Sequence, residues 1–210
     1  MRHGGGTGAR ASDPEFELCY LDAGGAERRE TPASWPGLRP EMFRPVRGFR
    51  WMRGQKHLPG LWWSATTGAH VGYESWLERD HVMLLDFDPE VTVIAAQPFW
   101  LRWRDDAGRS RRHAPDLFGR MADGSGAVID VRPDDRIEDK DAEAFAATRN
   151  ACELAGWGFR RVGVPDPVLM ANVAWLARYR HPRCGCSPDL AVRLTAETLV
   201  VVGTAPGGAR

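Results

Sequence analysis

The sequence predicts an α/β fold in which a helix, a mixed sheet of about four strands and a second helix form the core. A helical pattern over residues 73–87 precedes several strand-like segments, and a second helical pattern covers residues 138–155. With 43% apolar residues, the 210-residue chain is able to bury one sizeable core. This composition excludes wholesale disorder, collagen-like repeats and a coiled coil.

The N-terminal part is predicted to be irregular around one short strand. Residues 1–13 are rich in Gly, Ala and Arg, without periodicity, and we expect a disordered tail. The segment FELCYL at residues 16–21 favours a strand within an N-terminal region of residues 14–69. Five prolines between residues 32 and 60 exclude a helix there and predict an irregular arm.

A first helix is expected because apolar and aromatic residues recur at spacings of three and four, and it is expected to end before Pro89. This spacing predicts a core-facing stripe. Most tryptophans are likewise expected in the core, since they lie in strand or helix patterns. The predicted stripe contains Tyr73, Trp76, Leu77, Asp80, Leu84 and Phe87, and the tryptophans expected in the core are Trp62, Trp63, Trp100, Trp103, Trp157 and Trp175.

The following elements complete a core that we place at residues 70–165. Turn sequences such as DDAG and ADGSG separate the predicted strands, and Gly156 is expected to end the second helix. A C-terminal region of residues 166–210 should add a helix, a short strand and a tail. The expected strands cover residues 91–96, 99–104, 111–121, 127–132, 159–164 and the apolar stretch near 197–203, and the last helix covers residues 167–180.

Charge and hydropathy exclude further classes of protein. The 28 basic and 28 acidic residues cancel, which argues against a uniformly basic protein that coats nucleic acid. No apolar stretch is long enough for a membrane span, and no secretory signal pattern is present, so we expect a cytoplasmic protein without membrane contact. Four cysteines without a framework spacing fit a reducing compartment. The segment HPRCGC offers only part of a zinc site and favours a turn.

The most informative stretch is HAPDLFGRMADGSGAVIDVRP. A turn near Asp123 would place Asp116 almost opposite Asp130 on the neighbouring antiparallel strand, so that two carboxylates share one patch. Arg132 points to the same face as Asp130, because side chains in a strand alternate with period two. Carboxylate clusters are typical ligands of Mg²⁺ or Mn²⁺. The alternative is that Asp116 caps a turn while Asp130 and Arg132 form a surface ion pair.

The first helix offers a third carboxylate. Glu74 and Glu78 lie one turn apart in ESWLERD and so share a helical face. With Glu78, the set becomes an acid on the first helix, an acid on one core strand, and an acid followed two residues later by a cation on the next strand.

Basic residues suited to phosphate gather in two segments, the arm from Arg39 to Lys56 and the stretch from Arg102 to Arg112. A solvated surface is the alternative for the arm. His113 either supports the site, contacts DNA or is an ordinary strand residue, and Gln97 in AQPF either contacts DNA or satisfies backbone groups. The candidate DNA-binding residues are Arg44, Arg47, Arg50, Arg53, Lys56, Arg109, Arg111 and Arg112.

These residues and the order of elements resemble the PD-(D/E)xK nuclease fold, with Pro115-Asp116 and Asp130-Val131-Arg132 in the motif positions. More narrowly, the segments YESWLERDHVMLLDFDPEVTVIAAQPFWLRW, HAPDLFGR and VIDVRP resemble the TnsA family, the endonuclease subunit of heteromeric transposases. The resemblance implies a Mg²⁺-dependent (or Mn²⁺-dependent) DNA endonuclease, with DNA, an integrase-type transposase subunit and an ATPase regulator as partners, and it leaves self-association open. It places the catalytic set on Glu78, Asp116, Asp130 and Arg132 and the metal on the three acids, with Glu74 as the alternative helix glutamate.

The departure from the family pattern is Arg132, which stands where the family has lysine. An arginine binds phosphate and stabilises negative charge, but its high pKa prevents it from acting as a base. Lys140, early on the next helix, is an alternative source of a lysine at the site. The sequence therefore leaves two functions open, an active endonuclease and a DNA-binding or assembly module that keeps the nuclease fold without catalysis.

Overall fold

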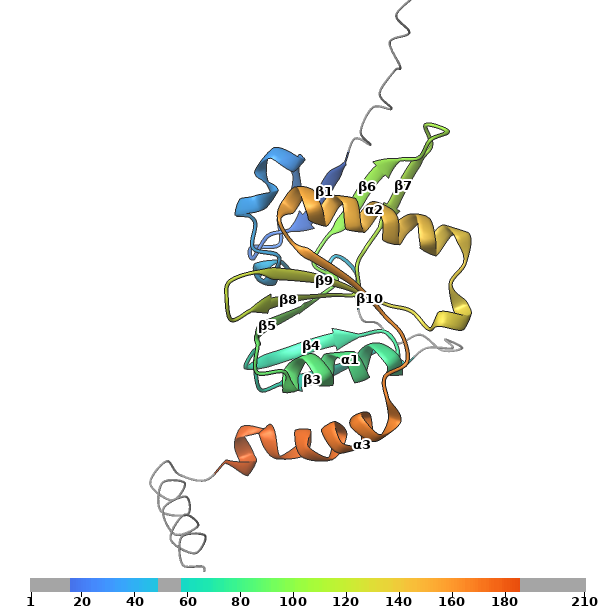
Figure 1. Cartoon of the computed structure of the whole chain (residues 1–210). Helices are drawn as coiled ribbons and strands as arrows, with labels where there is room; N and C mark the ends of the chain where they lie inside the picture. Colours follow the sequence, from blue (N-terminus) through green and yellow to red (C-terminus); the bar gives the residue numbers. More distant parts are fainter. Residues whose placement is uncertain (1–15, 49–57, 186–210) are drawn as a thin grey trace, which may run out of the picture.

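The computed structural model describes residues 16–48 and 58–185 (Figure 1). The predicted tail at residues 1–13 and the predicted C-terminal strand lie outside these residues, as do Arg50, Arg53 and Lys56. The described chain forms two four-stranded sheets and a separate hairpin, packed with three α-helices. The predicted mixed α/β architecture is therefore confirmed.

The central sheet has the strand order β10-β9-β8-β5. Strands β10 and β9 run parallel, and the other two pairs are antiparallel, as the sequence predicted for a mixed sheet of about four strands. The connection from β9 to β10 passes through α2, the usual way to join parallel neighbours. The strands are β5 (Val91–Ala96), β8 (Leu117–Met121), β9 (Gly126–Val131) and β10 (Gly158–Val162).

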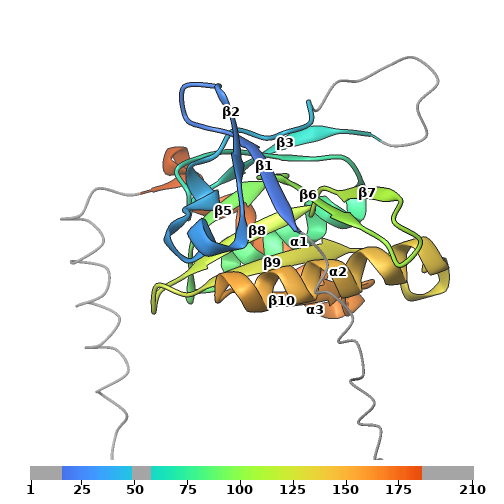
Figure 2. The same cartoon turned by 90° about the horizontal axis from the view of Figure 1, so that it is seen from above.

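The second sheet corrects one strand prediction. The segment 111–121 was expected as a single strand, but Ala114, Pro115 and Asp116 separate two strands that belong to different sheets. Pro115 has no backbone N–H to donate into a ladder, which explains the break. Asp116 therefore lies where the chain passes from one sheet to the other. The second sheet has the order β2 (Glu27–Glu30), β1 (Glu17–Leu21), β6 (Trp100–Arg104) and β7 (Ser110–His113) (Figure 2).

Helix α1 (Trp76–Phe87) was predicted within its bounds, but the predicted core stripe was wrong. Trp76 and Phe87 are exposed, because the buried positions of this helix fall on the neighbouring face. Two of the buried positions are carboxylates, which a search for apolar periodicity passes over. The buried residues of α1 are Glu78, Val82, Met83 and Asp86.

The hairpin of β3 (Gly60–Ser64) and β4 (Ala69–Tyr73), which the sequence did not predict, packs beside α1. Asp86 joins the two elements: its Oδ1 accepts from Ser64 Oγ and the Thr66 N–H, each at 2.8 Å, and its Oδ2 accepts from the indole N–H of Trp62 at 3.3 Å. These bonds explain how a carboxylate is buried to 2% exposure.

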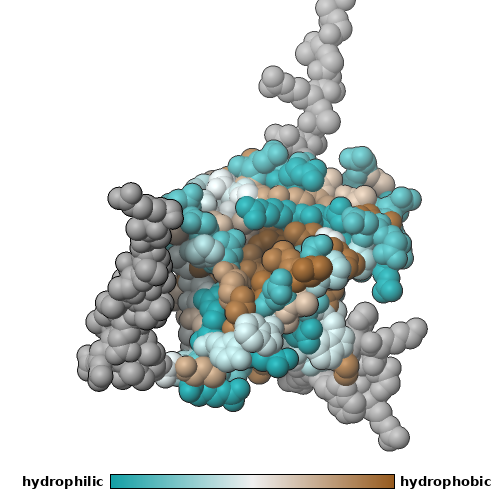
Figure 3. Space-filling view, turned by 60° about the horizontal axis from the view of Figure 1, so that its bottom comes forward, coloured by the Kyte–Doolittle hydropathy of each residue, from teal (hydrophilic) through white to brown (hydrophobic). Residues whose placement is uncertain are grey.

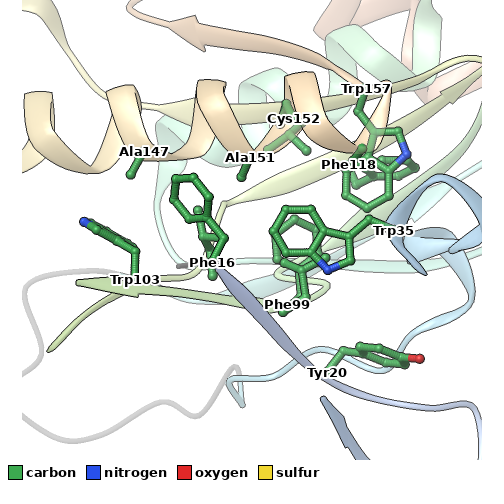
Figure 4. Close-up of a cluster of buried hydrophobic side chains, with 14 residues drawn as sticks. Phe16, Tyr20, Trp35, Phe99, Trp103, Phe118, Ala147, Ala151, Cys152 and Trp157 are labelled. Atoms are coloured by element: carbon green, nitrogen blue, oxygen red, sulfur yellow. The ribbon is translucent and has the colours of Figure 1, made fainter. Parts of the chain in front are cut away.

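Helix α2 (Asp139–Ala155) covers one face of the central sheet. It presents small side chains, among them Ala147 and Ala151, to aromatic rings of both sheets, so the backbone of the helix approaches closely (Figure 4). Gly156 ends the helix with φ 71°, a left-handed conformation that glycine adopts without strain, as predicted. The rings of this core come from Phe16, Tyr20, Trp35, Phe99, Trp103, Phe118 and Trp157.

The opposite face of the central sheet packs on α1 and β4. Alternation along β9 directs Ala127 and Ile129 to that face and Val128 to the face covered by α2. Asp130 follows Val128 by two residues and so lies on the α2 face, at the carboxyl end of the strand.

The N-terminal arm is irregular where it is described, as expected, with short 3-10 helices at Pro32–Gly37 and Pro40–Met42. Trp35 is fully buried. Glu41 accepts two hydrogen bonds from Arg120 of β8, at 2.8 and 3.1 Å, and this ion pair fixes the arm on the central sheet.

Helix α3 (Pro167–Leu176) and a following 3-10 turn (Ala177–Arg180) fill the predicted helix of residues 167–180. Apolar side chains of this region lie on the surface (Figure 3), and Trp175 is exposed, against the expectation of a core residue. Trp103 and Trp157 are buried as predicted, whereas Trp62, Trp63 and Trp100 are partly exposed. A helix able to cross a bilayer is absent from the residues that the structure describes.

Candidate active site

A cavity of about 590 Å³ lies at the end of the central sheet where Asp116 precedes β8 and Asp130 ends β9. The first turn of α1, the start of α2 and strand β7 complete its wall. Charged groups of both signs line it. The acids are Glu74, Glu78, Asp116, Asp130 and Asp141, and the bases are Arg47, Arg112, His113, Arg132 and Arg136.

The structure brings Asp116 and Asp130 together, as the position of the turn near Asp123 predicted. The backbone N–H of Val131 donates to Asp116 Oδ2 at 2.8 Å, and the backbone N–H of Asp116 is 3.4 Å from Asp130 Oδ1. Each aspartate side chain therefore contacts the backbone of the segment that carries the other. The alternative of a surface ion pair does not hold, because Asp130 is buried to 1% exposure and Arg132 bonds elsewhere.

The two oxygens of Asp130 differ in their surroundings. Oδ1 lies 2.9 Å from Nε2 of His113, while Oδ2 is buried and has no hydrogen-bond partner among the described residues. A buried carboxylate oxygen without a donor is costly, and the cost is removed when a cation or a donor occupies the space beside it.

Glu78 is held by the N-terminus of its own helix. Its Oε1 accepts from Ser75 Oγ at 2.9 Å and its Oε2 from the Glu74 N–H at 2.7 Å, while the Glu78 N–H donates back to Ser75 Oγ at 3.2 Å. Ser75 is thus the N-cap of α1 and satisfies the N–H of Glu78, while the Glu78 carboxylate is held by Ser75 and by the N–H of the residue before the cap. Glu74 lines the cavity and pairs with Arg47 at 2.9 Å.

Two acids of this cavity, Asp116 and Glu78, have raised pKa values. Burial raises the pKa of Asp116 well above its ordinary value, and the negative charges of Glu78 and Asp130 raise it further. Burial likewise raises the pKa of Glu78, against the hydrogen bonds from Glu74 and Ser75. A divalent cation among these carboxylates would remove that repulsion.

The donor set fits a hard cation such as Mg²⁺ or Mn²⁺ in its chemistry, since carboxylate oxygens line the cavity and one of them, Asp130 Oδ2, is unpartnered. The side chains do not form a finished cage. Across residues 16–48 and 58–185, no three His, Cys, Asp or Glu side chains are grouped closely enough to hold a metal ion. Binding would therefore require a rearrangement of side chains or water as a ligand.

Arg132 lines the same cavity but bonds to α2. Its Nη2 donates to Asp141 Oδ1 at 2.8 Å, and Asp141 Oδ2 accepts from the Glu138 N–H at 3.1 Å in the capping box of that helix. Lys140 does not reach the cavity. It is exposed, and its Nζ pairs with Glu138 at 2.7 Å, as a solvated helix lysine does.

The candidate DNA-binding residues divide between three places. Arg47 and Arg112 line the cavity, and both guanidinium groups lie over the ring of Trp100, at 5.8 and 4.7 Å from its centroid. Arg109 and Arg111 do not line the cavity, and they pair with Asp105 at the β6–β7 turn. Arg44 donates to the carbonyl of Ala23, and Arg50, Arg53 and Lys56 lie outside the described residues.

Gln97 is buried and has φ 45°, the one positive φ among the described residues other than glycine. Its N–H donates to the carbonyl of Asp116 and its carbonyl accepts from the Val46 N–H, each at 2.9 Å. Both bonds come from the backbone, so Gln97 connects the arm to the segment of Asp116, while its amide has no hydrogen-bond partner among the described residues.

Residues 88–162 match the model of a family described as the TnsA-like endonuclease N-terminal domain. This segment belongs to that family. The search of curated proteins found none that matches the chain. The TnsA-like segment contains Asp116, Asp130 and Arg132 but begins after α1, so Glu78 lies outside the match. The mixed sheet with α2 is the PD-(D/E)xK nuclease fold that the sequence predicted.

Sequence reasoning missed three residues that shape this cavity. Ser75 and Asp141 hold Glu78 and Arg132; Ser75 is the N-cap of α1 and Asp141 belongs to the capping box of α2, and their spacings, S-x-x-E and E-x-x-D, are visible in the sequence. Trp100 was expected in the core but lines the cavity between two arginines. Its position follows from the packing of the second sheet, for which the sequence offers no local sign.

Proposed function

We propose that the chain is a cytoplasmic, divalent-metal-dependent DNA endonuclease that hydrolyses phosphodiester bonds within a multi-subunit transposase-type machinery. An integrase-type transposase and an ATPase regulator are the proposed partners. The TnsA-like segment supports the reaction class. The observation on which the proposal rests is the cavity in which Asp130, whose Oδ2 has no partner among the described residues, lies beside Asp116.

Asp116 and Asp130 are the proposed ligands of Mg²⁺ or Mn²⁺. Glu78 is proposed to act through a water molecule, since both of its oxygens already accept hydrogen bonds from the helix terminus. When bound, such a cation polarises the scissile phosphate and lowers the pKa of a coordinated water.

The cations of the cavity have separate proposed roles. Arg132 stabilises the negative charge that develops on the phosphate, which a guanidinium does without proton transfer. Arg47 and Arg112, held over Trp100, contact the DNA backbone beside the scissile bond. The acids thus serve the metal, and the DNA is bound by the arginines around them.

The experiment is nicking of supercoiled plasmid by the purified chain, with its partner subunits present and either Mg²⁺ or Mn²⁺ added. We expect cleavage that EDTA stops and that Asp116→Ala and Asp130→Ala each abolish. Asp123→Ala, an exposed turn residue, is the matched control and should cleave as wild type. Cleavage that survives Asp116→Ala contradicts the proposal. DNA binding that is sensitive to salt but not to EDTA, with no nicking, would instead indicate a non-catalytic module.

A further inference from the structure

His113 stands at the end of β7, in the second sheet, while Asp130 ends β9 in the central sheet. The two side chains meet across the boundary between the sheets, with His113 Nε2 2.9 Å from Asp130 Oδ1. A carboxylate oxygen accepts, so the proton of the ring is assigned to Nε2.

We propose that His113 is a positioning residue that fixes the carboxylate of Asp130 so that Oδ2 alone is presented to a divalent cation. This inference rests on the proposed metal-dependent nuclease function and adds to it the group that orients the metal ligand. In this role His113 donates to the metal ligand and is not itself a ligand.

The contacts of Asp130 support these different roles of its two oxygens, Oδ1 as the acceptor for His113 and Oδ2 as the ligand of a cation. Oδ1 receives His113 Nε2 at 2.9 Å, and the Asp116 N–H at a longer 3.4 Å, whereas Oδ2 receives no donor among the described residues. Without the imidazole, only the long backbone contact would hold the carboxylate against rotation. Hydrogen bonds to a ligating carboxylate typically matter 10- to 100-fold in metal affinity, roughly.

The ring of His113 is itself held in place. Its residue pairs with Leu101 in the ladder of β6 and β7, and Leu101 is fully buried. The His113 side chain is 23% exposed and lines the cavity, so the ring reaches Asp130 Oδ1 from a fixed strand and makes no hydrogen bond to Oδ2. A donor on a rigid strand orients its partner better than one on a loop.

The experiment measures Mn²⁺ binding to the full chain without DNA, by the electron paramagnetic resonance signal of free Mn²⁺. We expect Asp130→Asn to abolish specific binding and His113→Ala to weaken it about 10- to 100-fold. His113→Asn, whose amide N–H is a donor, should recover part of the loss. His70→Gln, an exposed histidine on β4, is the matched control and should bind as wild type.

The outcomes separate this inference from the proposed function. Wild-type affinity in both His113→Ala and His113→Asn, with binding lost in Asp130→Asn, overturns the positioning role and leaves the metal site intact. Absence of Mn²⁺ binding in the wild-type chain overturns both. Nitrogen hyperfine coupling from His113 to bound Mn²⁺, lost in His113→Asn, overturns the inference in favour of direct ligation. If His113→Ala does not fold, the comparison of His113→Asn with wild type decides the matter.

Discussion

Arg132 Nη2 lies 2.8 Å from Asp141 Oδ1, so the cation at the position of the family's lysine is tied to the first turn of α2. The pair is partly exposed, with 43% of the Arg132 side chain accessible. Such a pair contributes little to stability, roughly 0–1 kcal/mol. The pair instead orients Arg132, because it holds the guanidinium at the rim of the cavity.

Substitution of Arg132 tests whether the cation acts on the phosphate. Removal of a single group that stabilises transition-state charge typically costs about 10²- to 10³-fold in kcat, and we expect a loss of that order for Arg132→Ala. Arg132→Lys keeps the charge and should cleave at least as well as wild type. Plasmid nicking under single-turnover conditions measures both, and an alanine variant as active as wild type would show that position 132 has no role in the reaction.

Asp116→Asn should stabilise the metal-free protein at neutral pH. The folded-state pKa of Asp116 is raised, so the folded state binds its proton more tightly, and stability falls as pH rises from the ordinary aspartate value of 3.8 through the raised pKa. Asparagine does not titrate, and its carbonyl is still able to accept from the Val131 N–H. Each unit of the shift corresponds to about 1.4 kcal/mol.

Urea unfolding from pH 4 to pH 8, with EDTA present, checks this expectation. The advantage of Asp116→Asn over wild type should narrow as the pH falls. A variant less stable than wild type at pH 8 would mean that the carboxylate is favourably solvated or paired in the folded state.

The juxtaposition of Asp116 and Asp130 was predictable because it depends on a short turn, whose length fixes the register of two neighbouring strands. The division of residues 111–121 was also visible in principle, since Pro115 interrupts the ladder. His113 and Asp130 meet across two sheets, and no local rule of spacing describes that contact. Long-range packing decides it.

Helix α1 shows a second limit. Its end followed from Pro89, but its buried face did not follow from apolar periodicity, because Glu78 and Asp86 are buried there. Asp86 is buried by donors from an unpredicted hairpin, and Glu78 by the helix terminus. From the sequence alone a carboxylate is placed on the surface, because acidic side chains are seldom buried without partners, and those partners are known only from the structure.

Asp86→Ala should destabilise the protein by more than about 2 kcal/mol. The substitution leaves the buried Ser64 hydroxyl and the Thr66 N–H without their acceptor, and each unsatisfied group costs roughly 1–3 kcal/mol. Asp88→Ala is the control at the end of the same helix, where the carboxylate accepts an exposed bond from the Glu90 N–H at 2.9 Å. Urea midpoints of the two variants give the comparison, and equal losses would rule out the network as a special source of stability.

Acidification should lower the stability of the fold through His81, whose Nε2 lies 2.7 Å from the carbonyl of Gly163 where α1 meets the segment after β10. Burial lowers the pKa of His81 below its ordinary value of 6.5, more than the Gly163 bond and the charge of Asp80 raise it. Below about 6.5 the unfolded chain therefore binds a proton that the folded chain resists, so the free energy of unfolding falls as pH decreases toward the lowered pKa.

His81→Gln should remove this part of the pH dependence, because the glutamine amide donates to a carbonyl without titrating. The measurement is the free energy of unfolding in urea between pH 5 and pH 8 for wild type, His81→Gln and the exposed-site control His70→Gln. The slope should flatten in His81→Gln alone. An unchanged slope in that variant would assign the acid sensitivity to other groups, and a flattened slope in His70→Gln would show that the effect is not specific to the buried ring.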